Sequence, residues 1–306
     1  MLNRRLTGQR SSHMFTSMGH WFRLGDLELL VVSDGVIRQD AGATFGLVPR
    51  VMWERFAPDL DAKNRIPVGN NSLVVRSAGK TVLLDTGVGT KPTRAPGAMD
   101  IEDSGRLLEN LSHSGVQPDD IDAVVNTHLH FDHCGGNTLD TEGKLMPAFP
   151  RARYFIQKGE WEAASHPNER TRGTYLAENF EPLEDARQVE LISGEVEVVR
   201  GVRIVPAPGH TEDHCVIELE SGGHYALYVG ELSQHPVMLE RLAWISAFDV
   251  LPLVSLETKR RMMEWAAEKR ALLVSVHAPY PGLGRLRADE GRKQKWEEAK
   301  ENGANQ

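Results

Sequence analysis

Four side chains with the chemistry of metal ligands occur within six residues near the middle of the chain. They are His128, His130, Asp132 and His133. Imidazole nitrogen and carboxylate oxygen bind Zn²⁺ and other first-row divalent cations. If the segment were only a solvated polar loop, the pattern would have arisen by chance, which should happen in roughly one in a thousand chains of this length. The segment therefore predicts a metal site.

The spacing of these four side chains predicts two ions rather than one. Residues two apart in an extended segment point the same way, so His128 and His130 can converge on one cation. Asp132 and His133 lie beyond the expected strand, where a turn toward the following glycine pair can aim them at a second cation.

The surrounding segments predict the elements that must position these ligands. Strands are expected at 27–33, 73–76, 81–84, 121–126 and 272–276, and through most of 188–229. Helices are expected at 103–114, 158–165, 255–270 and in the charged tail after Arg287. Neither a simple βαβ alternation nor an all-β pattern fits this order. Two mixed sheets packed together and covered by helices fit it, which is an α+β fold.

Composition restricts the partners of the chain. A formal charge of −8 and the lack of a long basic run argue against binding to nucleic acid. No apolar run approaches the ~18 residues that span a bilayer, so no membrane partner is expected. Two cysteines, Cys134 and Cys215, argue against a disulfide scaffold and are compatible with a reducing compartment. We therefore expect a cytoplasmic protein.

The ends of the chain differ in composition from its middle. Residues 1–25 contain arginine and serine but no apolar segment typical of a secretion signal. The first acidic residue of the chain is Asp26. We expect residues 1–25 to be an N-terminal extension, disordered or loosely docked, and residues 26–306 to form a single domain.

The 128–133 segment resembles the His-x-His-x-Asp-His signature of the metallo-β-lactamase superfamily, and the superfamily's other motifs occur in the same order and spacing. They are Asp85-Thr86-Gly87, Ala207-Pro208-Gly209-His210-Thr211, Tyr228-Val229-Gly230-Glu231 and Ser275-Val276-His277. The resemblance implies an αββα sandwich of two mixed β-sheets flanked by helices, and a homodimer.

The resemblance also implies the ligands of two divalent metal ions per chain. His128, His130 and His210 would hold one ion, Asp132, His133 and His277 the other, and Glu231 would bridge them. Asp85 would support the metal loop from behind without touching an ion. Zn²⁺ is expected, although imidazole and carboxylate also suit Mn, Fe and Co.

Within the superfamily, the pattern is most similar to N-acyl homoserine lactone lactonases and methyl parathion hydrolase. Two positions depart from it. Glu231 stands where the family normally has Asp, so its longer carboxylate must fold back or displace an ion. Gln234 stands where the lactonases have a pocket tyrosine, three residues after the bridging acid.

These residues predict a dinuclear metal-dependent hydrolase of carboxylic esters or lactones, with phosphotriesters as further candidate substrates. A hydroxide bridging the ions would attack, one ion would polarise the substrate oxygen, and Asp132 would act as ligand or proton shuttle. One alternative is hydrolysis of thioesters, as in glyoxalase II, or of β-lactams. An alternative of another class is a catalytically weak metal- or ligand-binding protein, in which Glu231 has compromised catalysis.

Aromatic side chains near the expected mouth of the site predict an apolar wall for a small-molecule substrate. Core or dimer packing is the other interpretation of each of them. The candidates are Trp53, Phe56, Phe149, Trp161, Trp244 and Phe248, together with His235, which is close to Glu231 in sequence.

Overall fold

Two mixed β-sheets face each other in the computed structural model, which describes residues 19–91, 99–289 and 292–299. The first sheet has the order β1-β2-β3-β4-β6-β9-β10, with β5 paired to β2. Its strands are β1 (Gly19–Leu24), β2 (Leu27–Asp40), β3 (Arg65–Ser77), β4 (Lys80–Leu84), β5 (Asp100–Asp103), β6 (Ala123–Val125), β9 (Arg153–Gln157) and β10 (Val189–Ile192). The pairs β4–β6, β6–β9 and β9–β10 are parallel and the others are antiparallel.

The second sheet follows the chain order from β11 to β17, and only its β14–β15 pair is parallel among the described strands. Its strands are β11 (Val196–Val199), β12 (Val202–Pro206), β13 (Cys215–Ser221), β14 (His224–Tyr228), β15 (Leu272–Val274), β16 (Leu283–Asp289) and β17 (Arg292–Glu298). A separate hairpin joins β7 (Thr138–Thr141) and β8 (Lys144–Pro147).

Strand β2 shows why the apolar runs of the sequence form a layered core. Successive side chains of a strand point to opposite faces. Leu29 and Val31 pack between the two sheets, whereas Leu30 and Val32 pack on the outer face, beneath helices. All four side chains are fully buried, because both faces of the strand are covered. A continuous apolar run, rather than an alternating one, is the pattern that such a strand requires.

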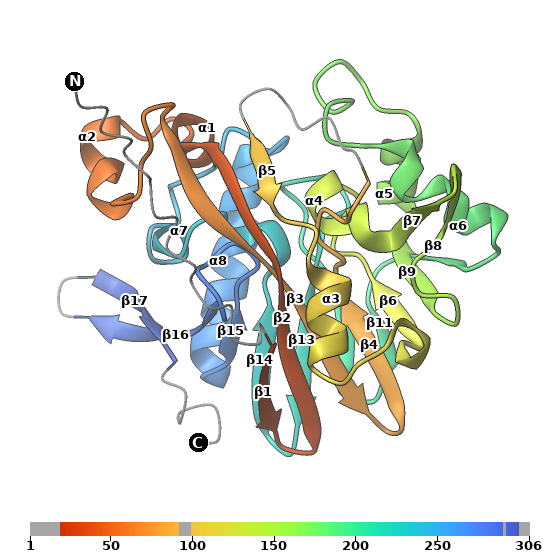
Figure 1. Cartoon of the computed structure of the whole chain (residues 1–306). Helices are drawn as coiled ribbons and strands as arrows, with labels where there is room; N and C mark the ends of the chain where they lie inside the picture. Colours follow the sequence, from red (N-terminus) through yellow and green to blue (C-terminus); the bar gives the residue numbers. More distant parts are fainter. Residues whose placement is uncertain (1–18, 92–98, 290–291, 300–306) are drawn as a thin grey trace, which may run out of the picture.

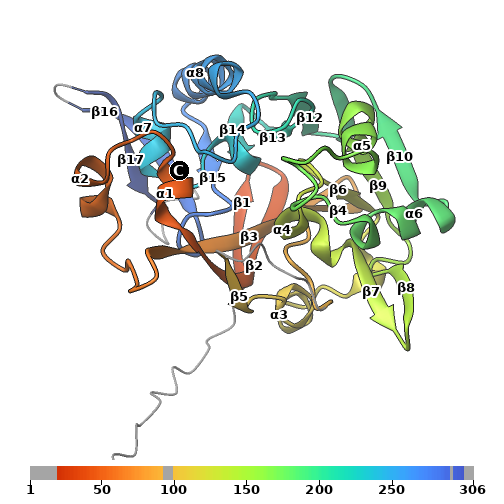
Figure 2. The same ribbon diagram turned by 90° about the horizontal axis from the view of Figure 1, so that it is seen from above.

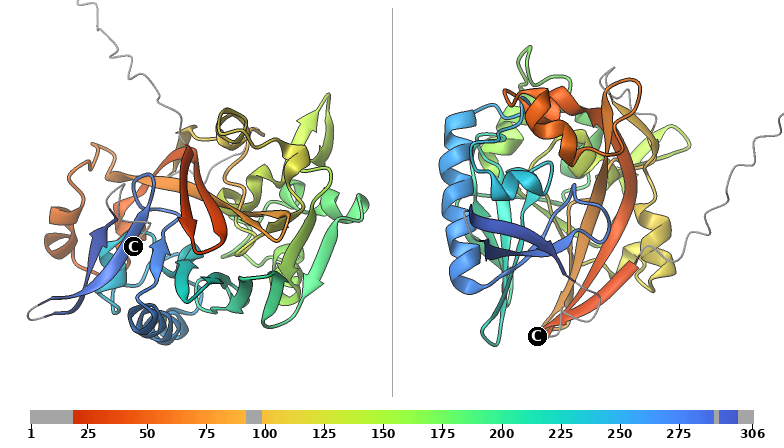
Figure 3. Two further views of the ribbon diagram at one scale, coloured as in Figure 1. Left: turned by 90° about the horizontal axis from the view of Figure 1, so that it is seen from below. Right: turned by 90° about the vertical axis from the view of Figure 1, so that its left-hand side faces the viewer.

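Helices cover the outer face of each sheet. Leu107 and Leu111 of α3 (Leu107–His113) pack on the first sheet, and Met262 and Met263 of α8 (Pro252–Lys269) pack on the second. Figure 2 and the right panel of Figure 3 show α3 and α8 on opposite sides of the paired sheets. This arrangement is the αββα sandwich that the sequence predicted.

The helices are short apart from α8. They are α1 (Ala41–Phe45), α2 (Arg50–Trp53), α3 (Leu107–His113), α4 (Phe131–Cys134), α5 (Lys158–Ser165), α6 (Glu181–Asp185), α7 (Val237–Glu240) and α8 (Pro252–Lys269). Turns of 3₁₀ helix are η1 (Glu54–Phe56), η2 (Pro118–Asp120), η3 (Gly135–Asn137), η4 (Ala177–Asn179) and η5 (Gly230–Leu232). Within the described residues, no helix is long and apolar enough to cross a lipid bilayer.

The sheets bring the expected ligands to one edge. The parallel strands β4 and β6 end side by side, and the loops that follow them carry Asp85 and His128. The parallel strands β14 and β15 likewise end together, just before Glu231 and His277. Figure 1 shows these strands in the middle of the sandwich. Residues more than 100 positions apart in the sequence therefore meet at one place.

Both ends of the described chain differ from the sequence prediction. Residues 19–24, placed in the N-terminal extension, form β1 and pair with β2, so that boundary is wrong; residues 1–18 lie outside the described residues. The tail expected as a helix is β17, paired with β16. Trp296 of β17 packs against Gly284 of β16, where any Cβ would lie 2.3 Å from its ring.

Candidate metal centre

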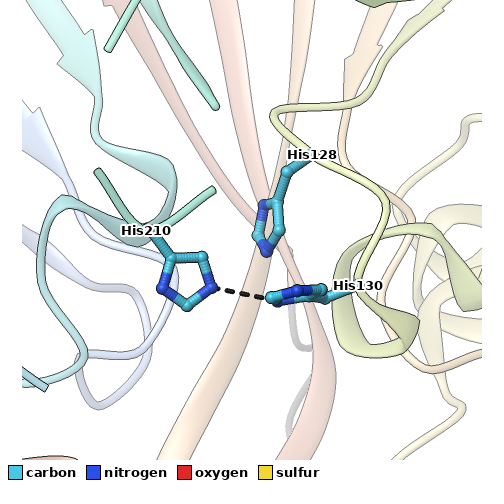
Figure 4. A group of neighbouring side chains, drawn as sticks. All are labelled: His128, His130 and His210. Carbon is cyan, nitrogen blue, oxygen red and sulfur yellow. Dashed lines mark hydrogen bonds between the residues drawn. The ribbon is translucent and has the colours of Figure 1, made fainter. Parts of the chain in front are cut away.

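Three histidines form the first of two ligand groups. His128 and His130 come from the loop between β6 and α4, and His210 from the loop between β12 and β13. The Nδ1 atom of His130 lies 3.0 Å from the Nε2 atom of His210. One nitrogen from each ring lies within 4.8 Å of the others. Figure 4 shows the three rings pointing toward one another from these two loops, and all three are buried.

The second group adjoins the first and contains two carboxylates. It consists of Asp132, His133, Glu231 and His277, whose ligand atoms also lie within 4.8 Å of one another. The Oε1 atom of Glu231 lies 2.9 Å from Nε2 of His277 and 3.5 Å from Nε2 of His133. The Oδ2 atom of Asp132 lies 3.8 Å from Nε2 of His133. The longer side chain of Glu231 thus folds back into the group.

The outer nitrogen of each of four histidines has a partner behind the site. Asp85 Oδ2 lies 2.9 Å from Nδ1 of His133, and Asp249 Oδ1 lies 2.9 Å from Nδ1 of His210. His277 Nδ1 donates to the carbonyl oxygen of Gly69 at 2.9 Å, and His128 Nδ1 lies 3.1 Å from Thr127 Oγ1. Such contacts fix the ring orientation and leave the other nitrogen as the electron-pair donor.

The inner atoms of the two groups fit divalent cations. Nε2 of His128, Nε2 of His133 and Oε2 of Glu231 are buried without a hydrogen-bond partner. Burying a polar atom without a partner is costly, and such atoms in a folded protein require an explanation. Unpaired imidazole nitrogens and a carboxylate oxygen, gathered at one point, are the donor set that a transition-metal or zinc ion takes.

Burial and charge act differently on the two groups. Burial, reinforced by neighbouring histidines, lowers the pKa of His128 and His130 well below the usual value. Burial also lowers the pKa of His133, but the charges of Asp132 and Asp85 outweigh it, so that this pKa is raised well above its usual value. For His277 the charge of Glu231 outweighs burial in the same way and raises its pKa.

The turn before Glu231 explains how that side chain reaches the centre. Gly230 has a φ of +51°, and a Cβ there would lie 2.5 Å from Nε2 of His214. His214 donates through Nδ1 to the carbonyl of Ala207 and accepts through Nε2 from the backbone N–H of Glu231, both at 2.9 Å. Burial lowers the pKa of His214 to about 4, which keeps this ring neutral and able to accept.

Asp85 has the supporting position that the sequence predicted. Its carboxylate accepts from the backbone N–H and the hydroxyl of Thr127, and from the hydroxyl of Tyr228, besides contacting His133. It therefore joins the loops that follow β4 and β6 of the first sheet to β14 of the second sheet.

Two supporting acids were not assigned from the sequence. Asp249 contacts Nδ1 of His210 and so fixes the orientation of that ring. Glu160 of α5 accepts from the backbone N–H of Leu129, from the hydroxyl of Tyr175 and from the hydroxyl of Thr211. Glu160 thus links the loop of His128 and His130 to the loop of His210. No sequence motif marks either acid, because each contact bridges segments far apart in the chain.

A cavity of about 150 Å³ opens onto the ligands. His130, Asp132, His210 and Glu231 form its floor. The rest of the wall is formed by Gln39, Met99, Phe131, Arg170, Thr171, Thr174, Gln234, Ala247, Phe248 and Val250. Of the aromatic residues predicted as the substrate wall, Phe248 alone lines this cavity.

The other predicted wall residues do not line this cavity, although Trp244 lines a larger cavity beside it. Trp53 and Trp244 pack around Phe45 in a core of their own, which also takes in Phe56 and the ring of His235. Phe149 is fully buried beneath the first sheet, and Trp161 packs there edge-on against Phe180. These rings pack in or against hydrophobic cores, which their positions in the sequence do not reveal.

Neither cysteine competes with these ligands. Cys134 and Cys215 are buried free thiols, and burial raises the pKa of each well above the usual value. Their sulfurs contact the backbone carbonyls of Leu129 and Thr127. Both therefore serve packing.

Comparison with known proteins places this site in a family context. The sequence profile of the Metallo-beta-lactamase superfamily matches residues 65–241. N-acyl homoserine lactonase AiiA from Bacillus thuringiensis subsp. kurstaki is 30% identical over 174 residues, which is 56% of this chain and 62% of that protein. The match thus spans less than two thirds of that relative's length.

Solved structures share the fold over nearly the whole chain. A probable metal-dependent hydrolase from Staphylococcus aureus superposes with a TM-score of 0.80 at 24% identity, covering 90% of this chain and 98% of the other. AidC, described as a dizinc quorum-quenching lactonase, superposes with a TM-score of 0.78 at 23% identity, covering 93% and 99%. The profile, which matches more than half of the chain, and the shared αββα architecture lead to one conclusion: the chain belongs to the metallo-β-lactamase superfamily.

Proposed function

We propose that the chain is a dinuclear metal-dependent hydrolase of carboxylic esters or lactones. One observation carries the proposal: two adjoining groups of buried candidate ligands include unpaired atoms, and four of these residues line a small cavity. The lactonase names of AiiA and AidC favour an ester or lactone over other substrates of the superfamily. The expected cytoplasmic location and homodimer stay predictions.

The ligand set suits hydrolysis without a nucleophile from the protein. Two bound divalent cations would supply a water that ionises near neutral pH and a Lewis acid for the substrate oxygen. We propose zinc for both, with His128, His130 and His210 holding one cation, and Asp132, His133 and His277 the other. Glu231 contacts His133 and His277, and we propose that it would be a ligand shared by both cations.

The chain's own residues hold the substrate and move protons. Asp132 lines the cavity and its side chain is more exposed than that of Glu231, 12% against 4%, so it serves as ligand and as proton shuttle to the leaving group. Phe131, Phe248 and Val250 provide apolar wall. A cavity of about 150 Å³ is about the size that holds one benzene molecule, which suits an ester or lactone group.

A larger apolar cavity lies beside the first and has room for the rest of a substrate. Its volume is about 620 Å³, and it shares Arg170 and Ala247 with the metal cavity. Arg170 donates to the carbonyl oxygens of Ala247 and Asp249, which joins the two cavity mouths. Leu47, Met52 and Leu253 line the larger cavity and are exposed, so a substrate with an apolar chain is favoured.

The test is hydrolysis by protein reconstituted with Zn²⁺, using γ- and δ-lactones with and without an N-acyl chain, aryl esters, a phosphotriester, a thioester and a β-lactam. We expect lactones or aryl esters to be hydrolysed fastest, and a chelator to abolish the reaction. His210→Ala should inactivate the protein, whereas His224→Ala, at an exposed position, should not. A protein with two bound ions that hydrolyses no ester or lactone would overturn the proposal.

A further inference from the structure

A pair of buried glutamines forms part of the cavity wall beside the ligands. Gln234 follows η5 and lies three residues after Glu231, and Gln39 comes from β2. The side chains of Gln234 and Gln39 are only 3% and 4% exposed, respectively. Both line the cavity with Asp132 and Glu231. Two buried polar amides in the wall of a candidate active site require an explanation.

A chain of hydrogen bonds fixes the direction in which each amide points. The hydroxyl of Thr44 donates its only hydrogen to the carbonyl oxygen of Asp40 at 3.0 Å. It must therefore accept from Gln39, whose Nε2 lies 2.9 Å away. The same Nε2 atom lies 3.2 Å from Oε1 of Gln234 and donates to it. The oxygen of Gln234 is thus turned toward Gln39.

This arrangement leaves the Nε2 amide group of Gln234 as a donor. Among the described residues that nitrogen has no hydrogen-bond partner. It is also not one of the fully buried polar atoms that lack a partner. A donor held in a fixed orientation in a small cavity favours negative charge that develops on a nearby oxygen. It does so without rearranging when the reaction occurs.

We propose that the amide nitrogen of Gln234 donates a hydrogen bond to the substrate's carbonyl oxygen, and to the oxyanion that this oxygen becomes. The inference rests on the proposed function and adds a catalytic donor to it. The attacking oxygen forms its bond to the carbonyl carbon, the π electrons move onto the carbonyl oxygen, and the amide N–H stays bonded to nitrogen. The proton for the leaving group comes from Asp132 or water, because an amide does not release one.

A hydrogen-bond donor such as Gln234 can be distinguished experimentally from a general acid. A hydrogen-bond donor that keeps its proton lowers the barrier by a similar amount for every leaving group. A general acid helps poor leaving groups more than good ones. A series of aryl esters with leaving groups of different pKa therefore tells the two roles apart. Gln234 should change the rate and leave the dependence on leaving-group pKa unchanged.

The experiment compares Gln234→Met, Gln234→Glu and Gln39→Met with the parent, all loaded with Zn²⁺. Gln234→Met should keep two ions and lose about 10²- to 10³-fold in kcat/KM, as for loss of one oxyanion donor. Gln234→Glu should lose as much, because an ionised carboxylate only accepts. Gln39→Met frees the Gln234 amide to turn, and should lose about 2- to 10-fold. Gln117→Met, at an exposed position, is the matched control.

A second readout does not depend on turnover. An alkyl phosphonate ester, which carries the charged oxygen of the transition state, should bind Gln234→Met about 10- to 100-fold more weakly by calorimetry. Loss of bound metal would reveal a variant that has not folded, and the isosteric Gln234→Glu variant then carries the comparison.

Two-metal Gln234→Met and Gln234→Glu variants with the parent's kcat/KM and phosphonate affinity would overturn the assignment of Gln234. A parent inert to every ester and lactone would instead overturn the proposed function. In that case phosphonate binding still decides whether Gln234 is a donor to a bound oxyanion.

Discussion

The two ligand groups of the centre differ in charge although they adjoin each other. The first contains three imidazoles and no acid, while the second contains two carboxylates and two imidazoles. In the first group, burial lowers the pKa of His128 and His130, which leaves these rings neutral. In the second, nearby carboxylates raise the pKa of His133 and His277.

This difference in charge determines how many protons each group must release when a cation binds. Neutral imidazoles need lose no proton when a metal binds, whereas protonated ones must release theirs first. The second group offers stronger attraction through its negative charge, but at low pH protons compete for it. His210 is the exception in the first group, since Asp249 raises its pKa against the effect of burial.

Loss of an acid from the second group should have the largest effect. Asp132→Ala removes both a ligand and the proposed proton shuttle, so kcat/KM should fall by about 10³-fold or more, equivalent to several kcal/mol of transition-state stabilisation. Steady-state kinetics and elemental analysis measure the result. Asp119→Ala, at an exposed position, is the control. Full activity in Asp132→Ala would remove the second group from the mechanism.

The supporting acids allow the two groups to be weakened separately. Asp85→Asn should lower metal affinity in the second group by about 10- to 100-fold, because His133 loses its charged partner. Asp249→Asn should weaken the first group by about 10-fold, because it alters a single contact to His210. Titration with a competing chelator measures both. If the two variants lost the same ion, the division into two groups would fail.

Acidification should release the ions in two steps. The pKa of both histidines of the second group, His133 and His277, is raised, whereas in the first group only that of His210 is. Protons should therefore compete first for the second group as pH falls, while His128 and His130 stay neutral to lower pH. Bound metal measured after desalting between about pH 8 and 5, the range in which histidine titrates, should show one ion leaving before the other. Asp132→Ala should lack the earlier step. Release of the first group's ion at higher pH would contradict this order.

Glu231→Asp should have the smallest effect. The hydrogen bond to His214 and the left-handed turn at Gly230 fix the backbone, so a shorter acid draws back from His277. We expect both ions to be retained and kcat/KM to fall about 2- to 10-fold, as for one weakened hydrogen bond. A variant that binds more metal and reacts faster would instead favour the alternative of a catalytically weak binding protein.

Local patterns in the sequence predicted the fold, and the candidate ligands that they marked lie together in the structure. The His128–His133 spacing and the strand ends at Glu231 and His277 carry their information within a few residues, and apolar runs marked the strands. The supporting acids Asp249 and Glu160 could not be found this way, because their contacts cross 39 and 51 positions. Most aromatic residues predicted for the substrate wall do not line the metal cavity, for a related reason. Sequence shows that Trp53 is apolar, but only packing decides whether it faces a cavity or a core.

The central claim is that seven side chains hold two ions, and counting ions in single-ligand variants tests it most directly. Elemental analysis of desalted, zinc-reconstituted protein should give two ions per chain for the parent and about one each for His210→Ala and His277→Ala. His166→Ala, on the exposed end of α5, should keep two. Fewer than about one tightly held ion in the parent, or two in both ligand variants, would contradict the account.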